Sequence, residues 1–124
     1  MRSLTELQNL DGRRALVTGG AGHIGGAAAE TLLELGAHVA LLDNDTVACE
    51  KRAEDLGRQF DVEVLPVTCD LTNEAQTRAA TQAAIDGLDG LDLIVHSAGY
   101  VGTTRVPGWA VAFAEQTGDA WDAA

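Results

Sequence analysis

The chain has 124 residues, enough for about one domain, and 46% of them are hydrophobic but only 4% aromatic, so alanine, leucine and valine must supply the core. A formal net charge of −11 argues against nucleic acid or an anionic membrane surface as a partner, because both bind clustered lysine and arginine. We see no apolar run long enough to cross a membrane and no signal-peptide pattern in the first ten residues, and we expect a cytoplasmic protein.

Apolar strands and amphipathic helices alternate along the chain. The strands are predicted at 14–17, 37–42, 62–67 and 91–95. The helices are predicted at 24–35, at 46–60 and from Thr72, as the N-cap, to about residue 85. In the first helix the buried face is expected at 24, 28, 31, 32 and 35, and Gly36 should close that helix in a left-handed conformation. A long loop is expected at 97–118, followed by the start of another helix at 120–124.

This alternation predicts a fold of the α/β class, a Rossmann-type doubly wound parallel sheet with right-handed crossovers and the strand order 3-2-1-4. Such a sheet normally continues beyond its fourth strand, yet the chain ends soon after it. The strand at 91–95 would then be an open edge, which proteins usually cover. We therefore expect residues 1–124 to be the N-terminal, cofactor-binding portion of a single domain that is truncated after the fourth strand.

A glycine-rich turn joins the first strand to the first helix. Gly20, Gly22 and Gly25 fit the pattern G-x-G-x-x-G in this strand–turn–helix context. Glycines there permit a tight turn and a close approach of the backbone, and the helix N-terminus offers free N–H donors to a pyrophosphate. The alternative is a turn that is rich in glycine and binds nothing.

An acidic residue ends the second strand, as expected for a protein that binds the hydroxyl groups of an adenosine ribose. Asp43 lies 18 residues beyond Gly25, and the first lysine or arginine after it is Lys51. A 2′-phosphate would meet the charges of Asp43 and Asp45, so we predict NAD as the cofactor in preference to NADP. The alternative role for Asp43 is to cap the turn that follows the strand.

These motifs together resemble those of the short-chain dehydrogenase/reductase family. The segment TGGAGHIG at 18–25 resembles its T-G-x-x-x-G-x-G motif, CDLT at 69–72 its Asp-Leu/Val step, and HSAG at 96–99 its N-N-A-G. Trp121-Asp122 resembles the start of a later family helix. His23 gives a spacing that also fits the extended branch of the family, which includes nucleotide-sugar epimerases. His96 and Ser97 replace the two asparagines of N-N-A-G.

The resemblance implies a set of cofactor-binding residues along the chain. The glycine turn would line the pyrophosphate, Asp43 would bind the adenosine ribose, the Asp-Leu step would contact the adenine, and the fourth strand would end beside the nicotinamide. For His23 two roles stay open, a positive charge near phosphate or an exposed residue whose backbone matters. The residues implied are Gly19, Gly22, His23, Ile24, Asp43, Asp70, Leu71, His96, Ala98 and Gly99.

The family's catalytic pair, Tyr-x-x-x-Lys, is absent from the sequence. The chain has one tyrosine, Tyr100, and one lysine, Lys51, and their positions do not fit this pair. We therefore assign no catalytic residue and expect no turnover by the chain alone. Cys49, Cys69 and the three histidines have no metal-ligand spacing, so no metal site is predicted and the cysteines should be reduced thiols.

Three functional hypotheses follow. The first is an NAD(H)-dependent oxidoreductase acting on an alcohol or carbonyl substrate, in which this chain supplies the dinucleotide-binding half. Its partners would be that small molecule and either further copies of the protein or a complementary C-terminal chain. The second is a non-catalytic dinucleotide-binding or interaction module. The third is a fragment of an extended-branch nucleotide-sugar epimerase or dehydratase.

Overall fold

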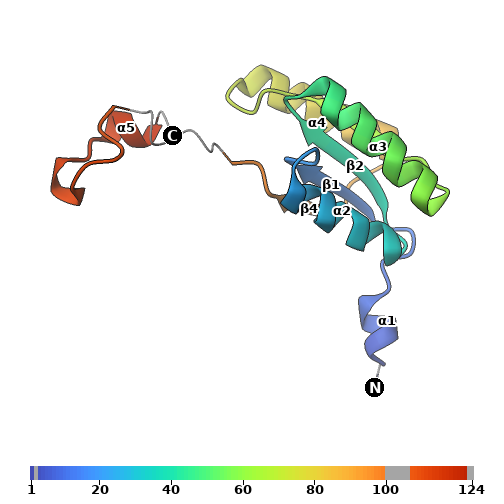
Figure 1. The fold of residues 1–124 in the computed structure, drawn as a ribbon. Helices are drawn as coiled ribbons and strands as arrows, with labels where there is room; N and C mark the ends of the chain where they lie inside the picture. Colours follow the sequence, from blue (N-terminus) through green and yellow to red (C-terminus); the bar gives the residue numbers. More distant parts are fainter. Residues whose placement is uncertain (2, 100–106, 123–124) are drawn as a thin grey trace.

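A computed structural model describes residues 1, 3–99 and 107–122 of the chain. Its centre is a parallel sheet in the order β3-β2-β1-β4, as predicted (Figure 1). Each strand pairs in parallel with its neighbours, and Thr18 at the end of β1 lies opposite both Leu42 and His96. The strands are β1 (Arg14–Thr18), β2 (His38–Asp43), β3 (Leu65–Thr68) and β4 (Leu93–His96).

Helices cover both faces of this sheet, which makes the fold doubly wound (Figure 1). Helices α2 (His23–Glu34) and α3 (Thr46–Phe60) pack on one face, and α4 (Glu74–Leu88) packs on the other. Side chains of a strand alternate between the faces, so Val17 and Leu41 join the α2–α3 core, whereas Leu16 joins the α4 core. Both cysteines are buried free thiols.

The buried face of α2 is shifted from the predicted one. Its buried residues are Gly25, Gly26, Ala29 and Leu33, and the first three are small, which lets the helix approach the sheet closely. Ile24, which we expected inside, is 78% exposed. The prediction was wrong because it followed the large apolar residues, whereas the glycine turn orients the helix so that its small residues face the strands. Gly36 has the expected positive φ of +93°.

Several boundaries differ from the predicted ones for local reasons. The N-cap of α4 is Asn73, whose side chain accepts the N–H of Gln76, whereas Thr72 donates its hydroxyl to Asp70. Strand β3 begins three residues later than predicted, because Asp61 ends α3 in the left-handed conformation and 62–64 form the connection. Strand β4 begins at Leu93 rather than residue 91.

Two short helices were not predicted. Helix α1 (Leu4–Gln8) begins with a capping box in which Ser3 and Glu6 satisfy each other's backbone N–H groups. A 3₁₀ turn, η2 (Phe113–Glu115), interrupts the expected loop, and the last helix, α5 (Gly118–Asp122), begins two residues early. The rings of Trp109 and Trp121 meet edge to face, 4.7 Å between centroids. Tyr100 lies outside the described residues.

Among the described residues, strand β4 forms one edge of the sheet. Its only described neighbour is β1. Ile94, on the face that α4 covers elsewhere, remains 61% exposed. The edge that the sequence predicted is therefore present, with an apolar side chain open to solvent.

Candidate functional site: the carboxyl ends of the strands

The fold brings the ten predicted site residues to one edge of the sheet. In a parallel sheet all strands end on the same side, so segments distant in sequence meet there. Asp70 and Leu71 follow β3, Asp43 ends β2, Gly19 to Ile24 follow β1, and His96 to Gly99 lie at the end of β4. Strand β1 pairs with both β2 and β4, so the glycine turn lies where the order of the strands reverses. This is the position at which doubly wound folds bind ligands.

The glycine turn is built by contacts that exclude side chains. Gly19 has a φ of +68°, and a Cβ there would lie 2.9 Å from the backbone of Ala98. A Cβ on Gly25 would overlap the carbonyl oxygen of Gly19 and lie 2.7 Å from its carbonyl carbon. Both glycines are therefore needed for the turn itself. A Cβ on Gly22, in contrast, would meet only the Gly19 oxygen, at 3.3 Å.

Helix α2 begins without a side-chain cap. Its N-cap is Gly22, whereas the N-termini of α1, α3 and α4 are capped by the side chains of Ser3, Asp45 and Asn73. The first N–H groups of a helix have no partner within the helix and carry a partial positive charge. In α2 these donors belong to His23 and Ile24, both exposed, and to Gly25. They can bind an anion.

Asp43 ties the glycine turn to the end of β2. One of its carboxylate oxygens accepts the N–H of Ala21, at 3.1 Å, and the other accepts the N–H of Asp45, at 3.2 Å. The side chain thus caps the next turn, as the alternative interpretation required. A carboxylate has about four acceptor positions, so two remain for hydroxyl groups of a ligand. Asp43 is half-buried and its charge faces the turn.

Thr18 joins the ends of β1 and β4. Its hydroxyl lies 2.9 Å from Nδ1 of His96 and accepts the N–H of Ala98 at 3.3 Å. Its carbonyl oxygen accepts the hydroxyl of Ser97 at 2.6 Å. These contacts hold the 96–98 segment against Gly19. Sequence reasoning missed the positioning roles of Thr18 and Ser97, although both lie inside the motifs, because their partners are almost 80 positions away.

Asp70 and Leu71 lie next to each other after β3, but they differ in environment. Asp70 is exposed and accepts the hydroxyl and the N–H of Thr72, at 2.7 and 2.9 Å, and these hydrogen bonds lower the pKa of its carboxyl. Leu71 is half-buried against the α4 core. The pair thus offers one charged acceptor and one apolar surface on the same edge of the sheet.

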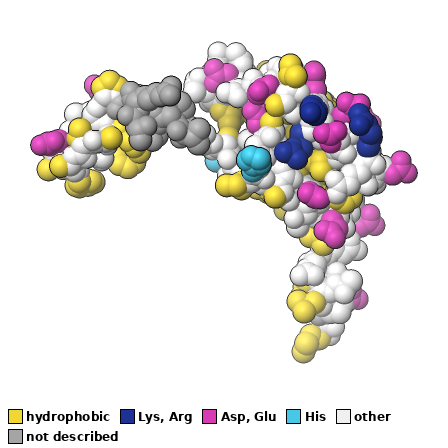
Figure 2. Space-filling view, viewed as in Figure 1, with side chains coloured by type: hydrophobic (Ala, Val, Ile, Leu, Met, Phe, Trp, Pro, Cys, Tyr) yellow, Lys and Arg dark blue, Asp and Glu magenta, His cyan; other side chains and the backbone are white. Residues whose placement is uncertain are grey.

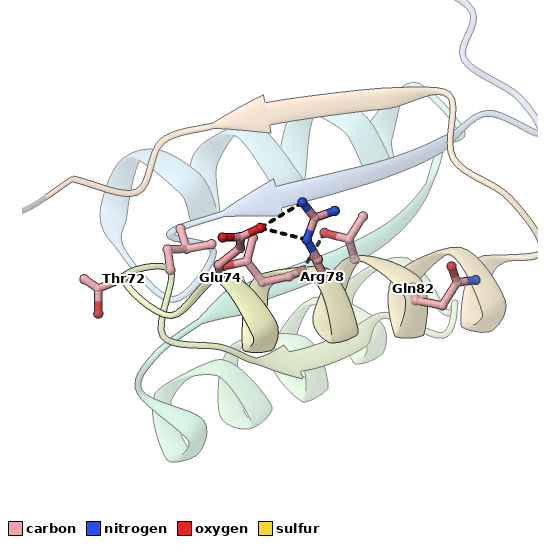
Figure 3. A pocket seen from close by; sticks show the side chains of 7 residues that line it. Thr72, Glu74, Arg78 and Gln82 are labelled. Carbon is pink, nitrogen blue, oxygen red and sulfur yellow. Dashed lines mark hydrogen bonds and ion pairs between the residues drawn. The ribbon is translucent and has the colours of Figure 1, made fainter.

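An open hollow of about 650 Å³ runs along α4 (Figure 3). Leu71 is the one predicted site residue among those that line it, and the others are Thr72, Glu74, Thr77, Arg78, Thr81 and Gln82. Glu74 and Arg78, one turn apart on α4, form an ion pair of 2.8 Å among these lining residues. The hollow therefore reaches the carboxyl edge of the sheet through Leu71, but no residue of the glycine turn lines it.

Fold and site together define a doubly wound α/β protein whose glycine turn and uncapped helix have the geometry of a dinucleotide-binding site. The sequence matches the family model for short chain dehydrogenases over residues 13–124. The chain therefore belongs to the short-chain dehydrogenase family of oxidoreductases.

Curated relatives agree with this family. The rhamnolipids biosynthesis 3-oxoacyl-(acyl-carrier-protein) reductase of Pseudomonas aeruginosa is 41% identical over 91 residues, 73% of this chain and 35% of that protein. The 15-hydroxyprostaglandin dehydrogenase (NAD(+)) of Bos taurus is 39% identical over 92 residues, with the same shares. The chain thus spans about 35% of the length of the relatives it matches.

A solved structure has the same fold. The NADPH-dependent 3-quinuclidinone reductase from Rhodotorula rubra superposes with a TM-score of 0.71 at 32% identity, covering 76% of this chain and 35% of that one. These three proteins are named as reductases or dehydrogenases, and none of the three is named as an epimerase or dehydratase. Their names include both NAD(+) and NADPH.

The described residues contain neither a membrane-spanning helix nor a cluster of metal-ligating side chains. No helix among them has the length and apolar character needed to cross a membrane. Within the same residues, no group of three or more histidine, cysteine, aspartate or glutamate side chains is arranged to hold a metal ion.

Proposed function

We propose that residues 1–124 form the nucleotide-binding part of an NAD(H)-dependent oxidoreductase that interconverts an alcohol and a carbonyl compound. The nicotinamide would carry the hydride. The chain's own residues would bind and orient the rest of the dinucleotide. The observation that carries the proposal is the position of Asp43, which is hydrogen-bonded to the glycine turn and has a negative charge at the end of β2.

The residues at this edge suit a dinucleotide in their order along the sheet. The free N–H groups of His23 and Ile24 would bind the pyrophosphate, with Gly22 leaving room for it and Gly19 lining it in the turn. Asp43 would accept hydrogen bonds from the adenosine ribose. Asp70 and Leu71 would contact the adenine, and His96, Ala98 and Gly99 would line the path to the nicotinamide.

The preference for NAD rests on charge, since the names of the relatives include both cofactors. A 2′-phosphate on the ribose would come within a few ångströms of the Asp43 carboxylate. Two like charges about 4 Å apart repel by roughly 4 kcal/mol at an effective dielectric constant near 20. Solvation reduces this value, but half of it would still favour NAD by more than about tenfold.

The dinucleotide-binding residues named above would not carry out the proton transfer. Reduction of a carbonyl group requires a proton donor within hydrogen-bond reach of the substrate oxygen. The family's Tyr-x-x-x-Lys pair is not in the chain, so we propose that it comes from a further part of the protein or from a complementary chain. Assembly into a homo-oligomer and a cytoplasmic location also stay predictions.

Calorimetric titration with NAD and NADP tests the proposal. Asp43→Asn keeps the shape of the side chain and an acceptor for the Ala21 N–H but removes the charge. We expect the wild type to bind NAD at least about tenfold more tightly than NADP and this variant to lose most of that preference. Asp55→Asn makes the same change of charge at an exposed position on α3 and should keep the preference. Equal or tighter binding of NADP by the wild type would contradict the proposal.

A further inference from the structure

Arg52 of α3 lies flat against α2 at Gly26. A Cβ on Gly26 would be 3.2 Å from Cζ, 3.3 Å from Nε and 3.4 Å from one terminal nitrogen of Arg52. Three nearly equal distances mean that the guanidinium presents its face to this α-carbon, and its N–H groups point sideways. The absence of a side chain on Gly26 allows this contact, because a Cβ there would press on the guanidinium and displace it by a few tenths of an ångström. Gly26 lies outside the G-x-G-x-x-G pattern, so the turn does not require it.

No protein group neutralises this guanidinium among the described residues. Arg13, Arg14, Arg58 and Arg78 each lie within 4.0 Å of a carboxylate. No described carboxylate lies within that distance of Arg52, and its side chain makes no hydrogen bond to a described residue. Of the six lysines and arginines among the described residues, Arg52 and its neighbour Lys51 are the two that form no ion pair there. Figure 2 shows Lys and Arg side chains over α3, interspersed with Asp and Glu side chains.

The position of this charge relates it to the start of α2. Gly26 is three residues after His23, about 4.5 Å along the helix axis from the first free N–H group. Helix α3 packs beside α2 on the side of β2 and Asp43. The guanidinium therefore stands at the flank of the anion-binding helix end, on the side where the proposed adenosine would lie.

We infer that Arg52 is a cofactor-binding residue that supplies a positive charge to the pyrophosphate, held in place by the bare backbone of Gly26. This inference rests on the proposed dinucleotide function and extends it to a residue outside the glycine motif. A planar guanidinium suits the task because it binds phosphate oxygens with paired N–H groups and stacks on flat surfaces. The charge adds to that of the helix end, where anions are already favoured.

Binding of adenosine and of ADP to the 124-residue chain tests the inference, because the two probes differ in the pyrophosphate. Arg52→Gln should weaken ADP binding by about three- to tenfold and change adenosine binding by less than about twofold. Arg52→Lys, which keeps the positive charge, should lose less ADP affinity than Arg52→Gln. Lys51→Gln is the matched control, with the same change of charge on the neighbouring residue of α3. This variant should bind adenosine and ADP with affinities within about twofold of those of the wild type.

The possible outcomes distinguish the role of Arg52 from the proposed dinucleotide-binding function. If Arg52→Gln binds ADP as the wild type does, the inference is wrong and the proposed function stands. If Arg52→Gln lost affinity for adenosine and ADP equally, or if its melting temperature fell together with its ADP affinity, Arg52 would have a structural role. Either result would also overturn the inference. A loss confined to NADP, with NAD unchanged, would assign the charge to the 2′-phosphate instead. If the wild type binds neither ADP nor NAD, the proposed function itself fails.

Discussion

The two ends of the sheet are built in opposite ways. At the amino end Arg14 is held by Asp92 through its Nε atom, at 2.8 Å, and by the backbone carbonyl of Asp89. The N–H of Arg14 also donates to Asp92. At the carboxyl end the first N–H groups of α2 have no side-chain cap, and glycines keep the turn free of side chains. One end satisfies its polar groups with side chains of the protein, and the other leaves donors for a ligand.

This difference between the ends of the sheet indicates that the amino end mainly stabilises the fold and that the carboxyl end mainly binds the ligand. Glycines at the carboxyl end contribute no side chain to the core, and free helix N–H groups make no internal hydrogen bonds. The ligand-binding end is therefore built at a cost in local stability. The ion pairs at the amino end join β1 to the approach of β4, two segments 78 residues apart. Substitutions at the two ends should therefore have different consequences for unfolding and for binding.

The largest expected effect is on folding, at the glycine where the turn closes on itself. Gly25→Ala would place a Cβ against the backbone of Gly19, which cannot move without breaking the turn. We expect it to lower the free energy of unfolding by about 2–4 kcal/mol and to abolish cofactor binding. Gly26→Ala is the control, since its Cβ would meet only the end of the Arg52 side chain, and it should change stability by less than about 1 kcal/mol. Urea denaturation of both measures this, and equal stabilities would show that the close approach does not constrain the turn.

A second substitution separates binding from folding at the carboxyl end. Gly22→Val adds a branched side chain where the structure leaves space and where the pyrophosphate would lie. We expect NAD affinity to fall by about 100-fold, while the free energy of unfolding changes by about 1 kcal/mol or less. Calorimetry and thermal unfolding measure the two quantities. Normal NAD binding with an unchanged melting temperature would mean that the turn does not hold phosphate.

A smaller effect is expected at the amino end, on stability alone. The hydrogen bonds from Arg14 hold the pKa of the Asp92 carboxyl at about 2, below its ordinary value of 3.8. A depressed pKa stabilises the fold above the ordinary value, and this contribution is lost as the pH falls toward 2. Asp92→Asn should therefore lower the melting temperature near neutral pH, and its difference from the wild type should shrink between about pH 4 and pH 2.

The matched change is Asp86→Asn on α4, where the carboxylate accepts a hydrogen bond from the neutral Gln82. Because it removes no ion pair to a described residue, it should lower the melting temperature less than Asp92→Asn does. NAD binding should be the same in both variants as in the wild type. A loss of NAD affinity in Asp92→Asn would show that the two ends of the sheet are not independent.

The parts of the fold that follow local patterns could be predicted from the sequence. Strand order, the glycine turn and the placement of Asp43 follow from alternating apolar runs and from residues close together in the chain. The buried face of α2 could not, because the closeness of Gly25 to Gly19 decides it and outweighs the large side chain of Ile24. Helix α1 was missed because it has only five residues, with Leu4 and Leu7 as its apolar pair, and is too short to show a helical period.

Contacts between distant segments were the part of the site that sequence reasoning could not reach. Nothing in the sequence places Arg52 on Gly26 or Thr18 beside His96, since these pairs form only when helices and strands pack. The N-cap of α4 was assigned to Thr72 because threonine and asparagine are both good caps and the pattern does not choose between them. In the structure Asp70 takes the Thr72 hydroxyl and leaves the cap to Asn73.

The central claim is that the backbone donors at the start of α2 bind the cofactor. Titration of the ¹⁵N-labelled chain with NAD tests it most directly, residue by residue. We predict the largest amide shifts at Gly19, His23, Ile24 and Gly25, and no significant shift at Arg14 or Asp92. Shifts spread evenly over both ends of the sheet, or largest at the amino end, would contradict the account.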